Sequence, residues 1–322
     1  MSFHSGFVCI LGRPNAGKST LLNALVGEKL AIISPKPQTT RNRIQGVVHV
    51  PKSKGKNKGG GQIVLIDTPG VHKPDSSLGR KMMVEVREAL EGCDLVLVIM
   101  DVTHRLDPRD QFALQMVKQA GAKTKVFLVL NKVDLIREKT KLLPLIDEYR
   151  NLYEFSEVIP ISALKRKGLD DLLELVIAAL PTGPAYFPED QVTDQPARFM
   201  AAESVREQVL LNTKEELPYA TTVIVENFEE EGKLTRIAAT IYCERQGQKG
   251  ILVGKGGQML KKIGTAARLQ IERMLGTKVF LELYVKVSPG WRDSRSFVDE
   301  LDWRRQLEHR MLERPESNDT VR

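Results

Sequence analysis

Residues 12–19, Gly12-Arg13-Pro14-Asn15-Ala16-Gly17-Lys18-Ser19, decide how the first half of the chain folds. They follow the apolar run 7–11, which is typical of a buried strand, and they precede residues that suit a helix. A strand, the pattern GxxxxGK[ST] and a helix N-terminus together form a phosphate-binding loop, because glycines let backbone N–H groups approach phosphate oxygens closely. The sequence therefore predicts that Lys18 reaches β- and γ-phosphates and that Ser19 binds Mg²⁺.

Short β-rich runs surround this loop and are mostly separated by segments long enough for helices, a pattern that predicts a mainly parallel sheet. The runs are residues 7–11, 43–50, 62–66, 94–100, 125–130 and 157–160. Residues 51–61 are too short and too rich in glycine for a crossover helix, so the two strands they join are expected to form an antiparallel hairpin. One edge strand of an α/β sheet should therefore run backwards.

The second half of the chain has a different pattern. Four prolines in residues 181–197 exclude a regular helix and predict a linker at 182–197, between a domain at 1–181 and another at 198–322. The second domain is predicted to contain a helix near 198–212, strands near 220–228 and 234–243, two helices flanking Gly-Lys-Gly-Gly, and a strand from Lys278. This αββααβ order is an α+β fold of the type II KH kind.

Two further motifs end strands of the first domain, where α/β sheets bind ligands. In Asp67-Thr68-Pro69-Gly70, the carboxylate is placed to hold Mg²⁺ through water, and the Gly70 N–H to sense a γ-phosphate. In Asn131-Lys132-Val133-Asp134, the Asp134 carboxylate can accept from N1–H and N2–H₂ of guanine, which predicts GTP rather than ATP. Residues 161–163, Ile-Ser-Ala, can support the base with a main-chain N–H.

The segment Gln38-Thr39-Thr40-Arg41 is expected to complete the Mg²⁺ shell with one threonine. Thr40 is preferred to Thr39 on the spacing of related GTPases, and the alternative is a turn that is merely rich in threonine. His72 is interpreted as a bystander rather than a general base. Asp101 and His104, which follow the run 94–100, are interpreted as loop and capping residues.

The Gly254-Lys255-Gly256-Gly257 turn between two helices is the arrangement with which KH domains clamp about four nucleotides of single-stranded RNA. Residues 245–310 contain fourteen Lys and Arg against seven Asp and Glu, which supports a polyanionic ligand. The residues predicted to contact RNA are Lys249, Gly254, Lys255, Gly256, Gly257, Lys261, Lys262 and Arg268. The nearby apolar residues either face the RNA groove or belong to the core, and the core is preferred for all four: Ile251, Val253, Leu260 and Ile263. Trp291 is either a base-stacking residue or an anchor for a C-terminal helix.

These motifs resemble the Era GTPase family, with GRPNAGKST, PQTTR, DTPG, NKVD and ISA in the family's order and a GKGG module after them. The resemblance covers almost the whole chain, and the Lys/Gly stretch at 52–61 is the main departure. It implies a GTPase that binds the 3′ end of small-subunit ribosomal RNA during assembly of the 30S subunit. Ras-like GTPases place a glutamine just after the DxxG motif, whereas Val71 and His72 follow Gly70 in this chain. The resemblance to GTPases without that glutamine implies slow intrinsic turnover, and it also implies a K⁺ ion bound with the help of Asn15.

The expected site is therefore extensive. The predicted GTP-binding residues are Gly12, Arg13, Pro14, Asn15, Ala16, Gly17, Lys18, Ser19, Thr20, Asp67, Thr68, Pro69, Gly70, Val71, Asn131, Lys132, Val133, Asp134, Ser162 and Ala163. Those predicted to serve catalysis are Lys18, Thr40, Gly70 and Asn15, and those predicted to hold Mg²⁺ are Ser19, Thr40 and Asp67.

Composition sets the remaining expectations. The formal net charge is +7, so a nucleic acid or an anionic membrane surface is a more natural partner than a basic protein. Cys9, Cys93 and Cys243 have neither disulfide-framework nor zinc spacing, and the longest apolar run, 95–100, is far short of a membrane span of roughly 20 residues. We expect a cytoplasmic monomer without a DNA partner, with peripheral membrane contact left open. The lysines at 52, 54, 56 and 58 are interpreted as a solvated loop, with a second rRNA contact left open.

Two rival functions follow from the same residues. The first is an RNA-binding assembly factor that binds GTP but barely hydrolyses it, which the missing glutamine favours. The second is a GTPase of tRNA modification, which would be expected to bring an extra domain with a catalytic cysteine or a folate site. No segment of this chain suits such a domain.

Overall fold

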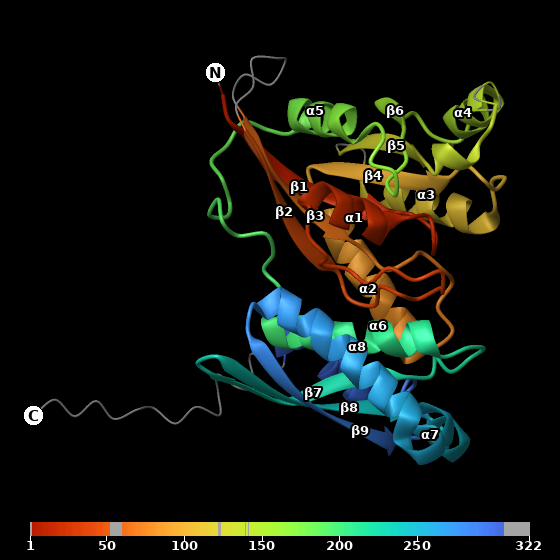
Figure 1. The fold of residues 1–322 in the computed structure, drawn as a ribbon. Helices are drawn as coiled ribbons and strands as arrows, with labels where there is room; N and C mark the ends of the chain where they lie inside the picture. Colours follow the sequence, from red (N-terminus) through yellow and green to blue (C-terminus); the bar gives the residue numbers. More distant parts are fainter. Residues whose placement is uncertain (1, 52–59, 122–123, 139, 141, 306–322) are drawn as a thin grey trace, which may run out of the picture. The chain divides into compact units, whose positions relative to one another are not determined.

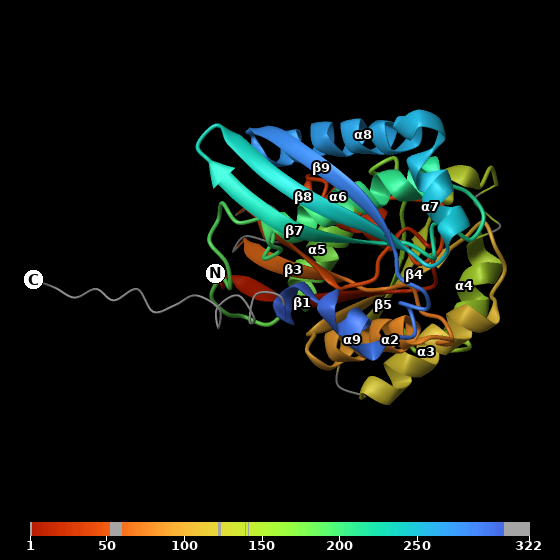
Figure 2. The same cartoon turned by 90° about the horizontal axis from the view of Figure 1, so that it is seen from below.

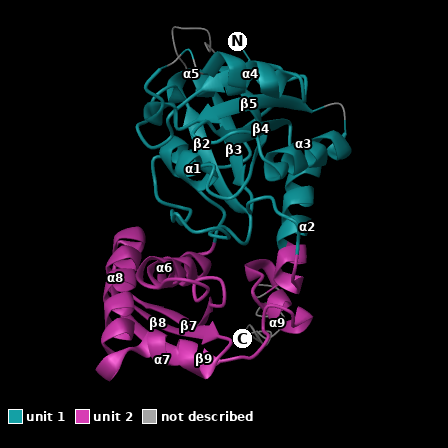
Figure 3. Ribbon diagram, turned by 90° about the vertical axis from the view of Figure 1, so that its right-hand side faces the viewer, with its two compact units in different colours: residues 1–74, 82–195 teal, residues 75–81, 196–322 magenta. Residues whose placement is uncertain are grey.

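The computed structural model describes residues 2–51, 60–121, 124–138, 140 and 142–305 (Figure 1). The prediction for the lysines at 52–58 lies outside these residues. The chain divides into two units: unit 1 contains residues 1–74 and 82–195, and unit 2 contains residues 75–81 and 196–322 (Figure 3).

Unit 1 is built on a six-stranded sheet in the order β2-β3-β1-β4-β5-β6. Its strands are β1 (His4–Leu11), β2 (Ile44–Val50), β3 (Gly61–Asp67), β4 (Leu95–Asp101), β5 (Lys125–Asn131) and β6 (Glu157–Pro160). Every neighbouring pair is parallel except β2 and β3, which form the antiparallel hairpin that the sequence predicted. All residues of β3 and β4 are buried, as expected for strands covered on both faces.

Helices follow β1, β3, β4, β5 and β6 along the chain. They are α1 (Lys18–Val26), α2 (Ser77–Glu91), α3 (Pro108–Ala120), α4 (Leu142–Arg150) and α5 (Leu169–Ala179). Helix α1 packs on β2 and β3, α5 packs on β1 and β3, and α3 packs on β4. Since the parallel strands share one direction, their carboxyl ends and the loops that follow them meet at one edge of the sheet.

Unit 2 has the predicted αββααβ order. Its elements are α6 (Ala197–Asn212), β7 (Thr222–Glu231), β8 (Leu234–Cys243), α7 (Gln246–Val253), α8 (Gln258–Leu275) and β9 (Lys278–Val287), followed by α9 (Arg295–Glu300). The strands run side by side in the order β7-β8-β9 (Figure 2), with β7 antiparallel and β9 parallel to β8. The predicted fold class, an α/β domain with one antiparallel edge strand followed by an α+β domain of αββααβ order, matches these elements.

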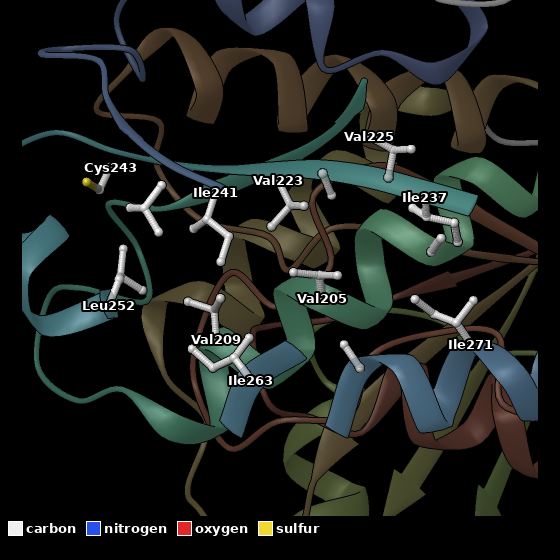
Figure 4. Close-up of a cluster of buried hydrophobic side chains, with 14 of the residues drawn as sticks. Val205, Val209, Val223, Val225, Ile237, Ile241, Cys243, Leu252, Ile263 and Ile271 are labelled. Carbon is white, nitrogen blue, oxygen red and sulfur yellow. The ribbon is translucent and has the colours of Figure 1, made fainter. Parts of the chain in front are cut away.

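The core of unit 2 lies between its sheet and helices α6 and α8 (Figure 4). Val205 and Val209 of α6 and Ile263 of α8 are fully buried against Ile237 and Ile241 of β8. The apolar face of β9 joins this core, because apolar residues alternate along the strand.

The segment that precedes α6 does not run freely from unit 1. The buried amide of Gln62 accepts from the N–H groups of Tyr186 and Phe187 and donates to the Phe187 carbonyl. Further along, the Val47 N–H donates to the Val192 carbonyl. The hydroxyl of Thr193 donates to the backbone carbonyl of Gln45. Residues 186–193 are thus bonded to β2 and β3.

Residues 75–81 belong to unit 2, although the chain on both sides of them belongs to unit 1. The Leu78 N–H donates to the Arg292 carbonyl at 2.9 Å, and the Lys81 ammonium donates to the Val298 carbonyl at 3.0 Å. Helix α2 therefore begins in unit 2 and ends in unit 1 (Figure 3). The division into folding domains 1–181 and 198–322 joined by a linker stays a prediction.

Candidate functional site

The phosphate loop joins β1 to α1, as predicted. Gly17 precedes the helix with a φ of +102°, and a Cβ there would lie 2.2 Å from the amide nitrogen of Asn131, so this position requires glycine. The ammonium of Lys18 is buried and donates to the carbonyls of Gly12 and Arg13 at 3.0 Å each. Burial lowers the pKa of Lys18 to about 8, against the opposing charge of Asp67. The lysine is therefore held in the curve of the loop.

Three oxygen-bearing side chains converge beside this lysine. The hydroxyls of Ser19 and Thr40 donate to one carboxylate oxygen of Asp67, at 2.7 and 3.2 Å, and lie 2.9 Å from each other. Burial raises the pKa of Asp67 to about 6, although Lys18 and both hydroxyls oppose the shift. The other carboxylate oxygen, Oδ1, is buried without a hydrogen-bond partner among the described residues. Hard oxygen ligands around an unsatisfied carboxylate fit Mg²⁺.

Thr39 takes a different position. Its hydroxyl donates to the Lys36 carbonyl at 2.6 Å, whereas the hydroxyl of Thr40 faces Asp67. Of the two neighbouring threonines, the geometry favours Thr40 as the metal ligand.

Asn131 ties three loops together at the end of β5. Its side chain donates to the Ala16 carbonyl at 2.9 Å and accepts from the Ala163 N–H at 3.0 Å. Lys132 follows with a φ of +70° and donates to the Asn15 carbonyl at 2.9 Å. The Ala163 N–H, one of the main-chain donors in residues 161–163, is thus bonded to Asn131 in this structure, and a main-chain contact from that segment to a base stays a prediction.

These loops surround a cavity of about 550 Å³. Its predicted lining residues are Pro14, Asn15, Gly17, Lys18, Ser19, Thr20, Thr40, Gly70, Asn131, Lys132, Asp134 and Ser162. The predicted residues Gly12, Arg13, Ala16, Asp67, Thr68, Pro69, Val71, Val133 and Ala163 are not among the lining residues. Several of these are supporting residues: the hydroxyl of Thr68, for example, donates to the Ile10 carbonyl beneath the loop.

Sequence reasoning missed part of the lining. The additional residues are Ile32, Ile33, Ser34, Pro35, Leu135 and Leu164, and the lining also includes Gln38 and Thr39 from the segment expected to complete the Mg²⁺ shell. Leu135 and Leu164 are 63% and 72% exposed, which is unusual for large apolar side chains beside two polar motifs. The sequence could have indicated both leucines, because they lie next to Asp134 and to Ser162-Ala163. A flat base needs apolar walls as well as polar partners.

His72 does not line the cavity. Its Nδ1 lies 2.9 Å from the Gly70 carbonyl, an acceptor, so Nδ1–H is the donor. The interpretation of His72 as a bystander is consistent with this geometry.

The predicted RNA turn lies between α7 and α8 in unit 2. Gly254 has a φ of +72°, and a Cβ there would press against the backbone nitrogen of Met259 at 3.0 Å. Gly256 and Gly257 face open space, so a ligand backbone can approach them. Helix α8 starts directly after Gly257 without a side-chain cap, which leaves its N-terminal N–H groups directed at that space.

The predicted RNA-contacting cations differ in their surroundings. Lys255, Lys261 and Lys262 are exposed near the turn, and Lys249 on α7 is half-buried. Arg268 donates to Glu272 at 2.8 Å and lies about 16 Å further along α8 than Gly257. The structure therefore brings the three exposed lysines to the turn but not Arg268.

Two apolar predictions are also settled by burial. Ile251 is 57% exposed, so its expected place in the core is wrong, because the helix turns Leu252 inward instead. Trp291 is fully buried, and its indole N–H donates to the Ala220 carbonyl at 3.0 Å. Its ring packs 5.7 Å from that of Phe297 in α9. Trp291 thus anchors the C-terminal segment and is not available to stack on a base.

A phosphate loop with a guanine-type base loop, joined to an α+β unit with a GxxG turn, defines a class: a P-loop GTPase that carries a KH domain. Family models agree, since one described as "50S ribosome-binding GTPase" matches residues 7–132 and one described as "KH domain" matches residues 216–292. GTPase Era of Ruminiclostridium cellulolyticum is 50% identical over 305 residues, which cover 94% of this chain and 99% of that protein. The chain belongs to the Era GTPase family and is a GTPase.

Two solved structures share the fold over 92% of this chain and 98% of theirs, each at 41% sequence identity. A point variant of Era from Aquifex aeolicus, bound to GDP and AlF₄⁻, superposes with a TM-score of 0.86. Era in complex with MgGDPNP and nucleotides 1506–1542 of 16S ribosomal RNA superposes with a TM-score of 0.87. Among the described residues, no helix is long and apolar enough to cross a membrane.

Proposed function

We propose that the chain is a GTP-driven switch that binds the 3′ end of small-subunit ribosomal RNA through unit 2 and times assembly of the 30S subunit. The observation that carries the proposal is the open Gly256-Gly257 turn at the start of α8, with exposed lysines beside it, in a chain that also has a GTPase cavity. The relative in complex with MgGDPNP and a 16S ribosomal RNA fragment supports the choice of RNA. Hydrolysis would then set how long that RNA is held.

In unit 1, the loop residues would divide the work on GTP. Lys18 already points into the phosphate loop and would bind the β- and γ-phosphates, and the Gly70 N–H would sense the γ-phosphate. Ser19, Thr40 and Asp67 would hold Mg²⁺, which when bound neutralises charge on the phosphates. The carboxylate of Asp134, at the cavity wall, would select guanine.

Water activation is assigned to no side chain of the described site. Val71 and His72 follow Gly70, so we propose slow intrinsic hydrolysis in which backbone groups, solvent or a partner place the water. Asn15 lines the cavity and donates to the Pro35 carbonyl at 2.7 Å, which orients its amide. We propose that Asn15 helps to bind a K⁺ ion, which would offset the negative charge of the phosphates. GTP hydrolysis should then be faster in K⁺ buffer than in Na⁺ buffer.

The cellular setting follows from the proposed RNA. Because the proposed partner is ribosomal, we propose that the chain acts in the cytoplasm, as a monomer without a DNA ligand. Because the net charge is +7, peripheral contact with an anionic membrane is the alternative to RNA binding that this protein's charge supports.

Multiple-turnover GTP hydrolysis tests the proposal, measured in K⁺ buffer with and without an oligonucleotide of the 3′ end of small-subunit rRNA. The key variant replaces Gly256 and Gly257 by Asp, which places carboxylates where RNA phosphates would approach. We expect RNA to stimulate hydrolysis by the natural protein and not by the variant, while both hydrolyse GTP at the same rate without RNA.

The same experiment separates the rival function. RNA that binds the natural protein without changing its turnover would point to an RNA-binding factor that merely carries GTP. RNA that does not bind at all would overturn the assignment of the KH unit but leave the GTPase intact.

A further inference from the structure

Asp101 is a buried carboxylate outside the cavity, at the C-terminal end of β4. It pairs in register with Asn131 on β5, so it lies next to the start of the base loop. One oxygen, Oδ1, accepts from the N–H of Thr103 at 3.0 Å and from its hydroxyl at 2.6 Å. These bonds alone describe a turn-stabilising aspartate, which is how the sequence was interpreted.

The second oxygen makes a different contact. Oδ2 accepts from the ammonium of Lys132 at 2.6 Å, and the same ammonium donates to the Asn15 carbonyl at 2.9 Å. Lys132 therefore bridges Asp101 to the phosphate loop. Its backbone is in the left-handed region, with a φ of +70°, a conformation that a lysine adopts only when its surroundings hold it.

The phosphate loop also reaches this carboxylate through Arg13. Its guanidinium lies 3.8 Å from Asp101, 2.9 Å from Asp107 and 3.7 Å from Asp110. The arginine side chain thus turns away from the cavity and toward acidic residues. Asp101 is the carboxylate that both Arg13 of the phosphate loop and Lys132 of the base loop approach.

We propose that Asp101 is a positioning residue for guanine-nucleotide binding: it holds the Lys132 ammonium on the Asn15 carbonyl and so keeps the phosphate loop and the base loop in register. The inference rests on the GTPase activity of the same site. Lys132 is about one-third exposed, so without the carboxylate its flexible side chain would turn to solvent. The two loops would then have to be ordered by the nucleotide itself, at a cost in affinity.

GDP and GTP dissociation constants of an Asp101→Asn variant test this proposal, together with kcat and KM for GTP. Removing the charge of the buried carboxylate from this partly exposed ion pair should weaken the binding of both nucleotides by about tenfold, which corresponds to about 1.4 kcal/mol. Because Asp101 does not line the cavity, kcat at saturating GTP should stay within about twofold. Asp101→Glu, which keeps the charge, should recover most of the affinity.

Two comparisons distinguish positioning from general destabilisation. Asp94 lies just before the other end of β4 and accepts from the Phe7 N–H at 2.8 Å, so Asp94→Asn removes the charge of a hydrogen-bonded carboxylate next to the same strand, at an exposed position. This control should leave the GDP dissociation constant unchanged. Adding Asp101→Asn to a Lys132→Met variant should change that constant by less than about twofold, because the substitution acts through Lys132.

The milder variant Thr103→Val keeps the charge but removes the 2.6 Å bond that orients it, and it should weaken GDP binding by about threefold. Unchanged GDP affinity in Asp101→Asn, or a full tenfold loss that persists without the Lys132 ammonium, would overturn the proposal. A natural protein that fails to bind GDP would instead contradict the GTPase assignment.

Discussion

Asp107 joins local folding to the phosphate loop. Its carboxylate accepts from the N–H of Arg109 at 2.7 Å and of Asp110 at 3.4 Å, so it caps the N-terminus of α3. The same carboxylate pairs with Arg13 at 2.9 Å. Partial burial alone would raise the pKa of Asp107, but hydrogen bonds from Arg109 and Arg13 outweigh burial and lower the pKa to about 2.

Asp107→Ala should therefore lower the free energy of unfolding by about 1–2 kcal/mol near neutral pH, the usual cost of a lost helix cap. The folded pKa lies below the ordinary value of 3.8, so the stabilisation is complete above that value and is lost as the pH falls toward 2. Urea unfolding of the natural protein and the variant between pH 7 and pH 3 measures the difference. A difference that stays constant, or that grows in acid, would show that the charge of Asp107 contributes nothing.

Individual residues differ in how far sequence could predict them. Lys18, Ser19 and Asp134 follow from short patterns, because their chemistry requires fixed spacing along the chain. The partners of Arg13 and the bond from Ala163 to Asn131 do not, because they join residues that are distant in sequence and meet only when the sheet forms. The role of Asp101 was missed for the same reason.

At the scale of elements, the direction of the hairpin strands was predictable, because a glycine-rich connection of eleven residues cannot hold a crossover helix. Prolines likewise predicted an irregular segment before α6. What they could not predict is that this segment lies against β2 and β3. That attachment depends on the buried Gln62, whose polar side chain lies near the start of a strand that is apolar from Ile63 to Ile66.

Gln62→Ala should release the segment at 186–187. Two N–H groups and one carbonyl would lose their hydrogen-bond partner, which should lower the free energy of unfolding by about 1–3 kcal/mol. Proteolytic cleavage between residues 181 and 195 should become faster. Gln111→Ala, on an exposed position of α3, is the matched control and should be cleaved like the natural protein. Equal cleavage of all three proteins would show that Gln62 does not hold the segment.

At the scale of the whole molecule, the question is whether RNA affinity comes from net charge or from where the charge lies. Residues 245–310 carry a surplus of seven basic residues, equal to the net charge of the entire chain. Lys255, Lys261 and Lys262 are the exposed part of that surplus nearest the GxxG turn. If the KH unit binds the RNA backbone, these lysines should replace counterions on individual phosphates, and the salt dependence of binding should count them.

Changing these three lysines to Gln should lower the slope of log affinity against log salt by about 2, since each contact to a single strand contributes roughly 0.7. A control with Lys29, Lys118 and Lys125 of unit 1 changed to Gln loses the same charge from exposed positions elsewhere. Fluorescence anisotropy with the rRNA oligonucleotide at several salt concentrations measures both slopes. If local contacts hold the RNA, only the first variant changes its slope and GDP affinity is the same in both. Equal losses in the two variants would instead mean that the protein attracts RNA through its overall charge, and the turn at Gly254–Gly257 would lose its assigned role.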